Sequence, residues 1–336
     1  MINENSSLAS LAEELNASRG GKPFLLVTHE RPDGDAVSSL FGMKNLLQEN
    51  GFQVEALLPY GVPDMYWNFL EGEEFLTEIS PDDAGKYEGI IYLDCAKQDR
   101  ASHPLLREKL PLPWKEINID HHGDNPFYAN TLSFVDKTAA SCSQIVYQLA
   151  VEASWQISAR TATFLLLGII TDSGCYRFDN TDAAAFLASA ALLEKGADRH
   201  RIVGECYMQK EENLILLEGE LVSQHLQKNK DNTFACIYLA PELLEKYKVD
   251  LRNTEQLIEA VRPMKGLKGC AVIRKEASGF KASLRAKEKE FPVGPVARVL
   301  GGGGHEMAAG CSIDAPDGAS AVKILFETVE KIWKKK

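Results

Sequence analysis

Four short apolar segments of this chain each end in aspartate or histidine, a pattern that packing alone does not explain. The side chains at these ends are His29, Asp33 and Asp35, then Asp94, then Asp120, His121 and His122, and finally Asp172. Carboxylates and imidazoles at the carboxyl ends of buried strands stand where open α/β sheets bind their ligands. The pattern therefore predicts one metal site assembled from four loops.

The residue types in this set indicate which metals it would hold. Carboxylates gathered in one pocket raise each other's pKa, and divalent cations remove that cost. Carboxylates combined with imidazoles, without a thiolate, favour manganese, iron or cobalt over magnesium or structural zinc. Two metals that share one carboxylate can activate a bridging hydroxide and hold a phosphate in line. We therefore expect two divalent ions, with manganese as the expected metal.

The composition is that of a globular protein with room for two domains. The chain has 336 residues, of which 45% are hydrophobic. Its first fifteen residues are polar and acidic, which predicts no signal peptide. The longest apolar stretch, 164–170, is far shorter than the roughly 20 residues of a membrane span. Seven scattered cysteines without a CxxC pair indicate reduced thiols. We therefore expect a cytoplasmic protein with no membrane partner.

The charge is unevenly distributed along the chain. The formal net charge is -11, but segment 262–298 carries ten lysines and arginines against three glutamates. Such a segment is either a solvated face or a basic wall that receives a phosphate-bearing ligand. A small basic wall facing an acidic metal cluster suits a short ligand better than a long duplex.

The elements that would position the site follow an alternating pattern. Strands are predicted at 24–28, 53–58, 89–94 and 115–119, and helices at 36–50, 141–152 and 158–171. Ser141 is the expected N-cap of its helix, and a long loop is expected between His122 and this residue. The alternation favours βαβ units and therefore an α/β fold with a mostly parallel sheet flanked by helices.

A second, smaller α/β domain is predicted after a helical connector. Further elements are expected as a helix at 183–196, a long helix at 201–228, a strand at 234–239, a helix at 254–260, strands at 269–274 and 279–285, and a helix at 293–300. The predicted division is 1–195 for the metal-binding domain, 196–230 for the connecting helix and 231–336 for the smaller domain. A Gly301-Gly302-Gly303-Gly304-His305 loop lies in the last of these. Taken alone, this loop is either a flexible linker or a backbone that closely approaches a ligand.

Taken together, these motifs resemble those of the DHH phosphoesterase superfamily. The matching residues are His29-x-x-Pro-Asp-Gly-Asp-Ala36, Asp94, Asp120-His121-His122 and Ile170-Thr171-Asp172-Ser173-Gly174, with the glycine loop resembling the signature of the family's smaller C-terminal domain. Within the superfamily the chain looks like the bacterial nanoRNase/pAp phosphatase group. It has no room for the added OB-fold of the family's single-strand exonucleases, and it lacks the transmembrane segments of the cyclic-dinucleotide phosphodiesterases.

The resemblance implies a role for each motif residue. His29, Asp33 and Asp94 would hold one metal, and Asp35, Asp94, His121 and Asp172 the other, so that Asp94 bridges. Asp120 would orient a histidine, and His122 would lie near the scissile phosphate. The active site would lie in the interdomain cleft. The far end of the substrate would be bound by Gly301 to His305 and by Arg285, with Arg262 and Ser141 as weaker candidates.

Two positions depart from the family pattern. Ser38 stands where many relatives have glycine, and Lys97 where relatives often place an acid.

The implied function is hydrolysis of short oligoribonucleotides, linear dinucleotides such as pApA, and 3′-phosphoadenosine 5′-phosphate (pAp), by a chain that could form a homodimer. The alternatives are a single-strand exonuclease on longer nucleic acid or a cyclic-dinucleotide phosphodiesterase, and more remotely a non-catalytic nucleotide-binding protein.

Overall fold

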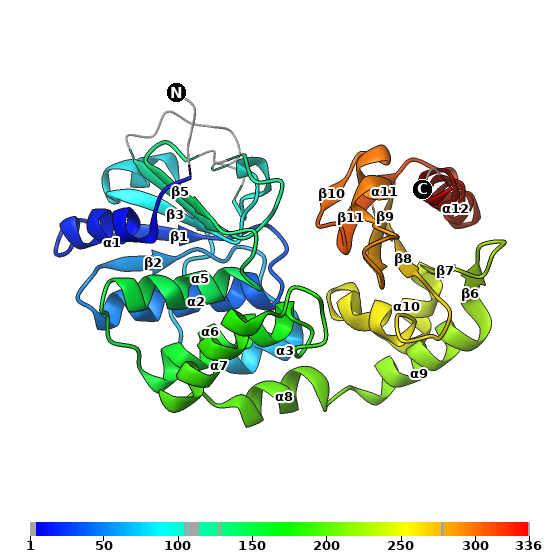
Figure 1. The fold of residues 1–336 in the computed structure, drawn as a ribbon, viewed down its shortest axis with the longest axis horizontal. Helices are drawn as coiled ribbons and strands as arrows, with labels where there is room; N and C mark the ends of the chain where they lie inside the picture. The colour runs from blue at the N-terminus through cyan, green and yellow to red at the C-terminus, as the bar shows by residue number, and fades with distance from the viewer. Residues whose placement is uncertain (1–4, 104–105, 107–113, 127–128, 277–278, 335–336) are drawn as a thin grey trace. The chain divides into compact units, whose positions relative to one another are not determined.

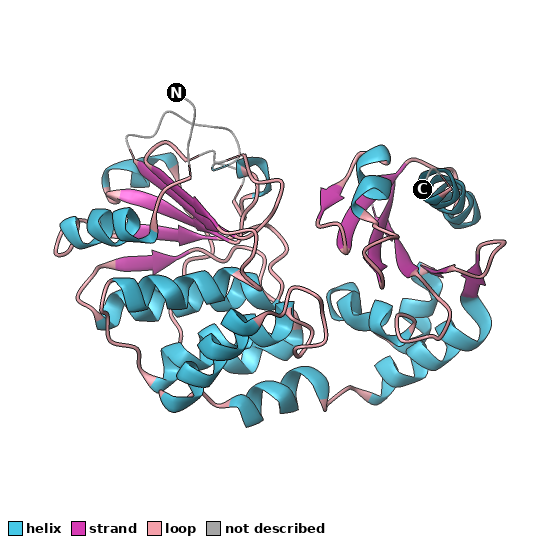
Figure 2. Cartoon of the chain, in the orientation of Figure 1, coloured by secondary structure: helices cyan, strands magenta, loops and turns pink. Residues whose placement is uncertain are grey.

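A computed structural model of the protein describes residues 5–103, 106, 114–126, 129–276 and 279–334. The chain divides into two compact units, residues 1–209 and residues 210–336. Each unit is built around its own sheet (Figure 1; Figure 2). Each unit also has its own hydrophobic core, as the composition predicts.

A five-stranded parallel sheet forms the centre of the first unit, with strand order β2-β1-β3-β4-β5. Its strands are β1 Phe24–Val27, β2 Val54–Ala56, β3 Gly89–Leu93, β4 Lys115–Asp120 and β5 Leu132–Val135. Because β1, β3 and β4 are parallel neighbours, their carboxyl ends meet at one edge of the sheet. The predicted parallel sheet is confirmed, and the edge that it creates collects the motif residues.

Burial on both faces explains why these strands are continuous apolar runs. Phe24 and Leu26 of β1 join the core that the sheet shares with α2, α5 and α6, whereas Leu25 and Val27 face a second cluster that includes Tyr92. Alternation of polar and apolar residues is expected only when one face meets water.

The helices of the first unit pack on this sheet or on one another. They are α1 Leu8–Ala17, α2 Gly34–Glu49, α3 Asp64–Trp67, α5 Cys142–Glu152, α6 Ala159–Asp172, α7 Ala183–Glu194 and α8 Arg199–Tyr207, with short 3-10 turns at 68–70, 81–85 and 98–100. Figure 1 shows α2, α5 and α6 on one side of the sheet. Among the described residues, no helix is both long enough and apolar enough to cross a membrane.

The second unit contains a six-stranded mixed sheet with strand order β10-β11-β9-β8-β7-β6, in which only β7 and β8 are parallel neighbours. Its elements are α9 Glu212–Glu220, β6 Leu226–Lys228, β7 Phe234–Leu239, α10 Pro241–Tyr247, a 3-10 segment Leu251–Ala260, β8 Gly269–Glu276, β9 Gly279–Ala286, α11 Gly294–Val299, β10 Gly303–Gly304, β11 Ala308–Ile313 and α12 Gly318–Trp333. One face of the sheet packs on α11 and α12, and the other packs on α9 and α10. The predicted smaller α/β domain is confirmed.

The prediction of one long helix over 201–228 is wrong. The segment contains α8, a break, α9, a π-type turn at Leu221–His225 and strand β6. The physical reason is that its apolar residues serve different cores: Ile202 packs in the first unit and Leu217 in the second. The loop expected after His122 also contains a strand, β5, which pairs with β4.

Candidate metal centre

The motif residues of the first unit form two groups of ligand-type side chains. The first group is His29, Asp33 and Asp94, and the second is Asp35, His121 and Asp172. In each group, one ligand atom from every residue lies within 4.8 Å of the others. The structure therefore brings together all six predicted metal ligands, although they come from four separate segments.

Asp94 lies between the two groups. Its Oδ2 is 3.8 Å from His29 Nε2, and its Oδ1 is 3.4 Å from His121 Nε2. The residue follows β3 directly and has a φ of 52°, which is uncommon for a residue other than glycine. One carboxylate oxygen is thus directed toward each group, an arrangement in which a carboxylate can bridge two ions.

The N-terminus of α5 holds Asp35 in place. The backbone N–H groups of Cys142 and Ser143 donate to the two oxygens of Asp35 over 2.6 and 3.0 Å. Ser141 is the N-cap, as predicted, and its Oγ accepts from the N–H of Gln144. Ser141 is fully buried, and it caps the same helix N-terminus whose backbone N–H groups bind Asp35.

Two glycines allow the helices around Asp33 and Asp35 to approach closely. Asp33 is the N-cap of α2, and its Oδ1 accepts from the backbone N–H groups of the next turn. A Cβ on Gly34 would lie 2.4 Å from Thr171 Oγ1, and a Cβ on Gly168 would lie 2.5 Å from Asp35 Oδ1. Only glycine fits at these two crossings.

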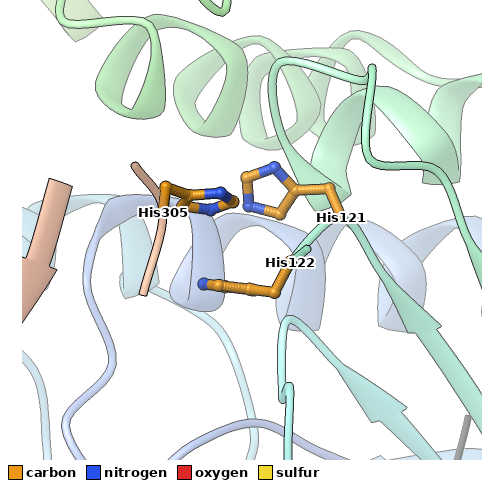
Figure 3. Close-up of side chains that lie close together, drawn as sticks. All are labelled: His121, His122 and His305. Atoms are coloured by element: carbon orange, nitrogen blue, oxygen red, sulfur yellow. The ribbon is translucent and has the colours of Figure 1, made fainter. Parts of the chain in front are cut away.

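Hydrogen bonds fix the two histidine rings that follow β4. His121 Nδ1 lies 3.3 Å from the carbonyl oxygen of Ala139, so that its N–H donates there and Nε2 is directed at the carboxylates. His122 Nδ1 is 2.7 Å from Asp120 Oδ1. Figure 3 shows the rings of His121 and His122 beside each other, with centroids 4.8 Å apart.

Asp120 is fully buried, and its oxygens are already used within the protein. Oδ1 accepts from His122 Nδ1 and from the backbone N–H of His121, and Oδ2 accepts from Asn125 Nδ2 over 2.6 Å. These bonds support the implied role of Asp120 as the group that orients His122.

Two asparagines belong to the site, and the sequence analysis missed both. Asn125 anchors Asp120 and also donates to Asn118 Oδ1. Asn180 donates to the backbone carbonyls of Asp172 and Ala140, and its amide lies 3.4 Å from Asp172 Oδ2. Neither residue directly follows a predicted strand, so no pattern in the sequence pointed to them.

The ionisation of the buried groups reflects crowding of like charges. Burial and neighbouring Asp94 raise the pKa of Asp35 well above its ordinary value. Burial and the nearby carboxylates raise the pKa of Asp172 to about 6, although His121 acts to lower it. Burial disfavours charge on His121, yet the surrounding carboxylates raise its pKa well above the ordinary value. Without cations, protons are therefore held in the site.

The site fits divalent cations on two further observations. Asp94 Oδ1 and His29 Nδ1 are buried, and neither has a hydrogen-bond partner within the described part of the chain. Buried polar atoms normally have partners. The donor set of carboxylates and imidazoles is one that manganese, iron or cobalt accepts.

The remaining predicted residues lie in the second unit. Arg285 is on β9 and donates through Nη1 to the carbonyl oxygen of Leu284, and Arg262 pairs with Glu259 at 3.4 Å. Gly303 and Gly304 form β10, paired with β11. A Cβ on Gly302 would lie 2.0 Å from the carbonyl oxygen of Gly310, so this glycine is required by packing. The remainder of the predicted loop is Gly301, with a φ of 75°, and His305, which follows β10.

The two departures from the family pattern are a buried residue and a surface residue of the first unit. Ser38 is buried in α2, and its Oγ has no hydrogen-bond partner among the described residues. Lys97 lies 3.5 Å from Asp124 Oδ2 at the surface. Neither residue belongs to the two ligand groups.

Two curated relatives resemble the chain over most of its length. The "Bifunctional oligoribonuclease and PAP phosphatase NrnA" of Bacillus subtilis (strain 168) is 28% identical over 316 residues, which cover 91% of this chain and 94% of the relative. The protein of the same name from Thermus thermophilus is also 28% identical, over 96% of this chain and 93% of its own.

A solved structure and two family models agree with this likeness. A crystal structure of an exopolyphosphatase-related protein from Bacteroides fragilis has the same fold, with a TM-score of 0.85 and 24% identity over 98% of this chain and 97% of the other. The family model for the DHH family N-terminal domain matches residues 23–169, and that for the DHHA1 domain matches residues 231–334. The chain therefore belongs to the DHH family, and it joins a DHH N-terminal domain to a DHHA1 domain.

Proposed function

We propose that this chain is a metal-dependent phosphoesterase that hydrolyses short oligoribonucleotides, linear dinucleotides such as pApA, and pAp. The observation that carries the proposal is the position of Asp94 between two groups of ligands, with one carboxylate oxygen directed at each. The names of the curated relatives support the same substrate classes.

The residues of the chain have distinct parts in this reaction. His29 and Asp33 with Asp94, and Asp35, His121 and Asp172 with Asp94, would hold two divalent cations, for which we propose manganese. Bound there, the cations would supply Lewis-acid stabilisation of phosphate charge and a water of lowered pKa.

In the proposed reaction, His122 would move a proton. Burial opposes its charge, but Asp120 raises the pKa of His122 to about 9. With Nδ1–H bonded to Asp120, the protonated ring presents Nε2–H, which can donate to a phosphate oxygen or to the leaving group. Asn125 keeps Asp120 in place for this task.

The second unit is proposed to bind the far end of the substrate through Arg285, the glycine loop and His305. Such a division would favour short ligands, because each additional nucleotide adds little binding and some steric cost. It also explains why the basic residues of segment 262–298 accompany an acidic metal site.

A single-turnover substrate panel tests the proposal. The chelator-stripped protein would be supplied with one metal at a time and assayed on pApA, pAp, cyclic dinucleotides, and five-mer and twenty-mer RNA. We expect activity with manganese or cobalt and a rate that falls steadily from the dinucleotide to the twenty-mer. Equal or faster cleavage of the twenty-mer would indicate an exonuclease. A preference for cyclic substrates would indicate a cyclic-dinucleotide phosphodiesterase. Binding without turnover would indicate a non-catalytic protein. Highest activity with zinc and none with manganese would contradict the metal assignment.

A further inference from the structure

The loop that follows β3 returns to the end of β1, where His29 lies. It begins at Asp94 and forms a short 3-10 turn that ends at Arg100. The backbone N–H of Glu30 donates to the carbonyl oxygen of Arg100 over 2.9 Å, and the residue after Arg100 forms an antiparallel bridge with His29. The loop therefore connects two members of the first ligand group, and Arg100 lies beside that group.

Arg100 brings a positive charge to this end of the sheet. Its side chain is exposed, and its guanidinium group makes no ion pair or hydrogen bond within the described part of the chain. The charge acts on the site: burial is the main effect that lowers the pKa of His29, Asp33 and Asp94 oppose it, and Arg100 lowers it further. Arg100 is thus a cation near the first ligand group that no described side chain neutralises.

Two other basic residues that follow the ligand-bearing segments have partners within the protein. Lys97, on the same loop as Arg100, lies 3.5 Å from Asp124 Oδ2. Arg177, in the turn after α6, donates through Nε to the carbonyl oxygen of Gly174. In contrast, the donors of Arg100 remain available to a ligand.

The charge balance of the proposed metal centre calls for such a cation. Four of the six ligand-type residues are aspartates, whose negative charges two divalent cations would balance. The pair of Asp120 and protonated His122 is also neutral as a whole. A phosphate monoester brings about two further negative charges at neutral pH, and a diester brings roughly half of that charge. Positive charge in excess of the metals must then come from another group of the protein.

We propose that Arg100 binds the non-bridging oxygens of the scissile phosphate. It would thereby favour substrates in which this phosphate is a monoester, such as pAp, over those in which it is a diester, such as pApA. A guanidinium group can donate two parallel N–H bonds to a phosphate, which suits it to this contact. The inference rests on the function proposed above, and it adds a substrate contact from the metal-binding unit to those proposed for Arg285 and His305.

Steady-state kinetics of Arg100→Ala test the selectivity. The value of kcat/KM for pAp should fall roughly tenfold to a hundredfold, the scale of a lost hydrogen bond from a charged group, and the loss for pApA should be smaller. Arg19→Ala is the matched control, because Arg19 is also exposed but precedes β1, at the opposite edge of the sheet, and it should change neither value. Equal losses for pAp and pApA would overturn the proposed selectivity.

Binding of inorganic phosphate tests the contact without turnover. Calorimetric titration of the manganese-loaded protein should show roughly tenfold weaker phosphate binding in Arg100→Ala. Arg100→Lys should recover part of this loss, because it keeps the charge without the paired donors. Manganese content, measured by atomic emission, should be the same in all three proteins.

Two results of the phosphate titration would overturn the assignment of Arg100. Phosphate affinity that is unchanged in Arg100→Ala would show that this residue does not bind the anion. A loss of manganese in the variant would show that Arg100 supports the ligand group instead. If the unmodified chain binds phosphate but hydrolyses neither pAp nor pApA, the proposed function is wrong, and the phosphate affinity of Arg100→Ala still decides the role of Arg100.

Discussion

Asp94 combines burial with an unusual backbone conformation. It is buried, it adopts a left-handed backbone conformation, and one of its oxygens has no hydrogen-bond partner among the described residues. His121, His122 and His29 lower its pKa even though burial opposes this, so the carboxylate stays ionised. Such strained positions persist at functional sites where the surrounding structure holds the residue in place.

Asp94→Asn should abolish hydrolysis while leaving the fold intact. Asparagine tolerates a positive φ, so the turn after β3 can persist, but the amide offers a single neutral oxygen. We expect kcat to fall by more than roughly a hundredfold, because even groups that only orient metal ligands contribute 10- to 100-fold. Activity measured with saturating manganese, alongside thermal unfolding of the metal-free protein, checks this. If the variant keeps more than about a few per cent of the original rate with saturating manganese, Asp94 is not the bridging ligand.

Metal binding should release protons near neutral pH. The raised pKa values of Asp35, Asp172 and His121 mean that the metal-free site holds protons, and divalent ions bind the deprotonated ligands. Affinity for manganese should therefore weaken as pH falls from about 8 to about 6, since protons then compete better. Titration calorimetry in two buffers of different ionisation enthalpy measures the number released. A binding enthalpy that does not depend on the buffer would contradict this prediction.

At the scale of secondary structure, the positions of the ligand-type side chains depend on where α2, α5 and α6 begin or end, and on how closely these helices pack. The N-terminus of α5 provides two N–H groups to Asp35, and Asp33 begins α2. The carboxyl end of α6 provides Asp172. Gly168 lies where α6 passes Ser143 and Asp35, and this close approach keeps the carboxylate against the α5 N-terminus.

Gly168→Ala should disrupt the second ligand group. Its Cβ would lie 2.0 Å from Ser143 Oγ and 2.5 Å from Asp35 Oδ1, so one of these groups must move. We expect a destabilisation of about 1–3 kcal/mol and weaker manganese binding. Gly204→Ala in α8 is the matched control, because no heavy atom lies within 4 Å of the Cβ position there. Metal titration and thermal unfolding distinguish the two; equal metal affinity in both variants would show that the Gly168 contact does not hold Asp35.

Across the molecule as a whole, the predicted roles are divided between two units. All six proposed metal ligands lie in the unit of residues 1–209, whereas Arg285, the glycine loop and His305 lie in the unit of residues 210–336. Variants in the second unit should therefore change how substrate is bound without changing how metal is held.

Arg285→Ala should lower kcat/KM. The loss should correspond to roughly 1.5–3 kcal/mol of transition-state stabilisation, the scale of a hydrogen bond from a charged group. Metal content measured by atomic emission should not change. Lys281→Ala is a suitable control, since Lys281 lies two alternations earlier on the same strand, β9. If Arg285→Ala loses metal, or if the control variant has the same effect on kcat/KM, the assignment of Arg285 to the substrate is wrong.

The family, the two α/β units and the segments that supply the six ligand-type residues could all be predicted from the amino-acid sequence. This was possible because buried parallel strands are short apolar runs, and the polar residues that follow them are visible in the chain. The same reasoning failed for the helix over 201–228, because apolar spacing does not say which of two cores a helix faces.

How these residues are held in place depends on the three-dimensional packing. The contact between Asp35 and the N-terminus of α5 joins residues more than a hundred positions apart, and the Asn180 bond to the carbonyl of Ala140 joins two loops. Such partners are set by the packing of α2, α5 and α6, and no local pattern encodes them.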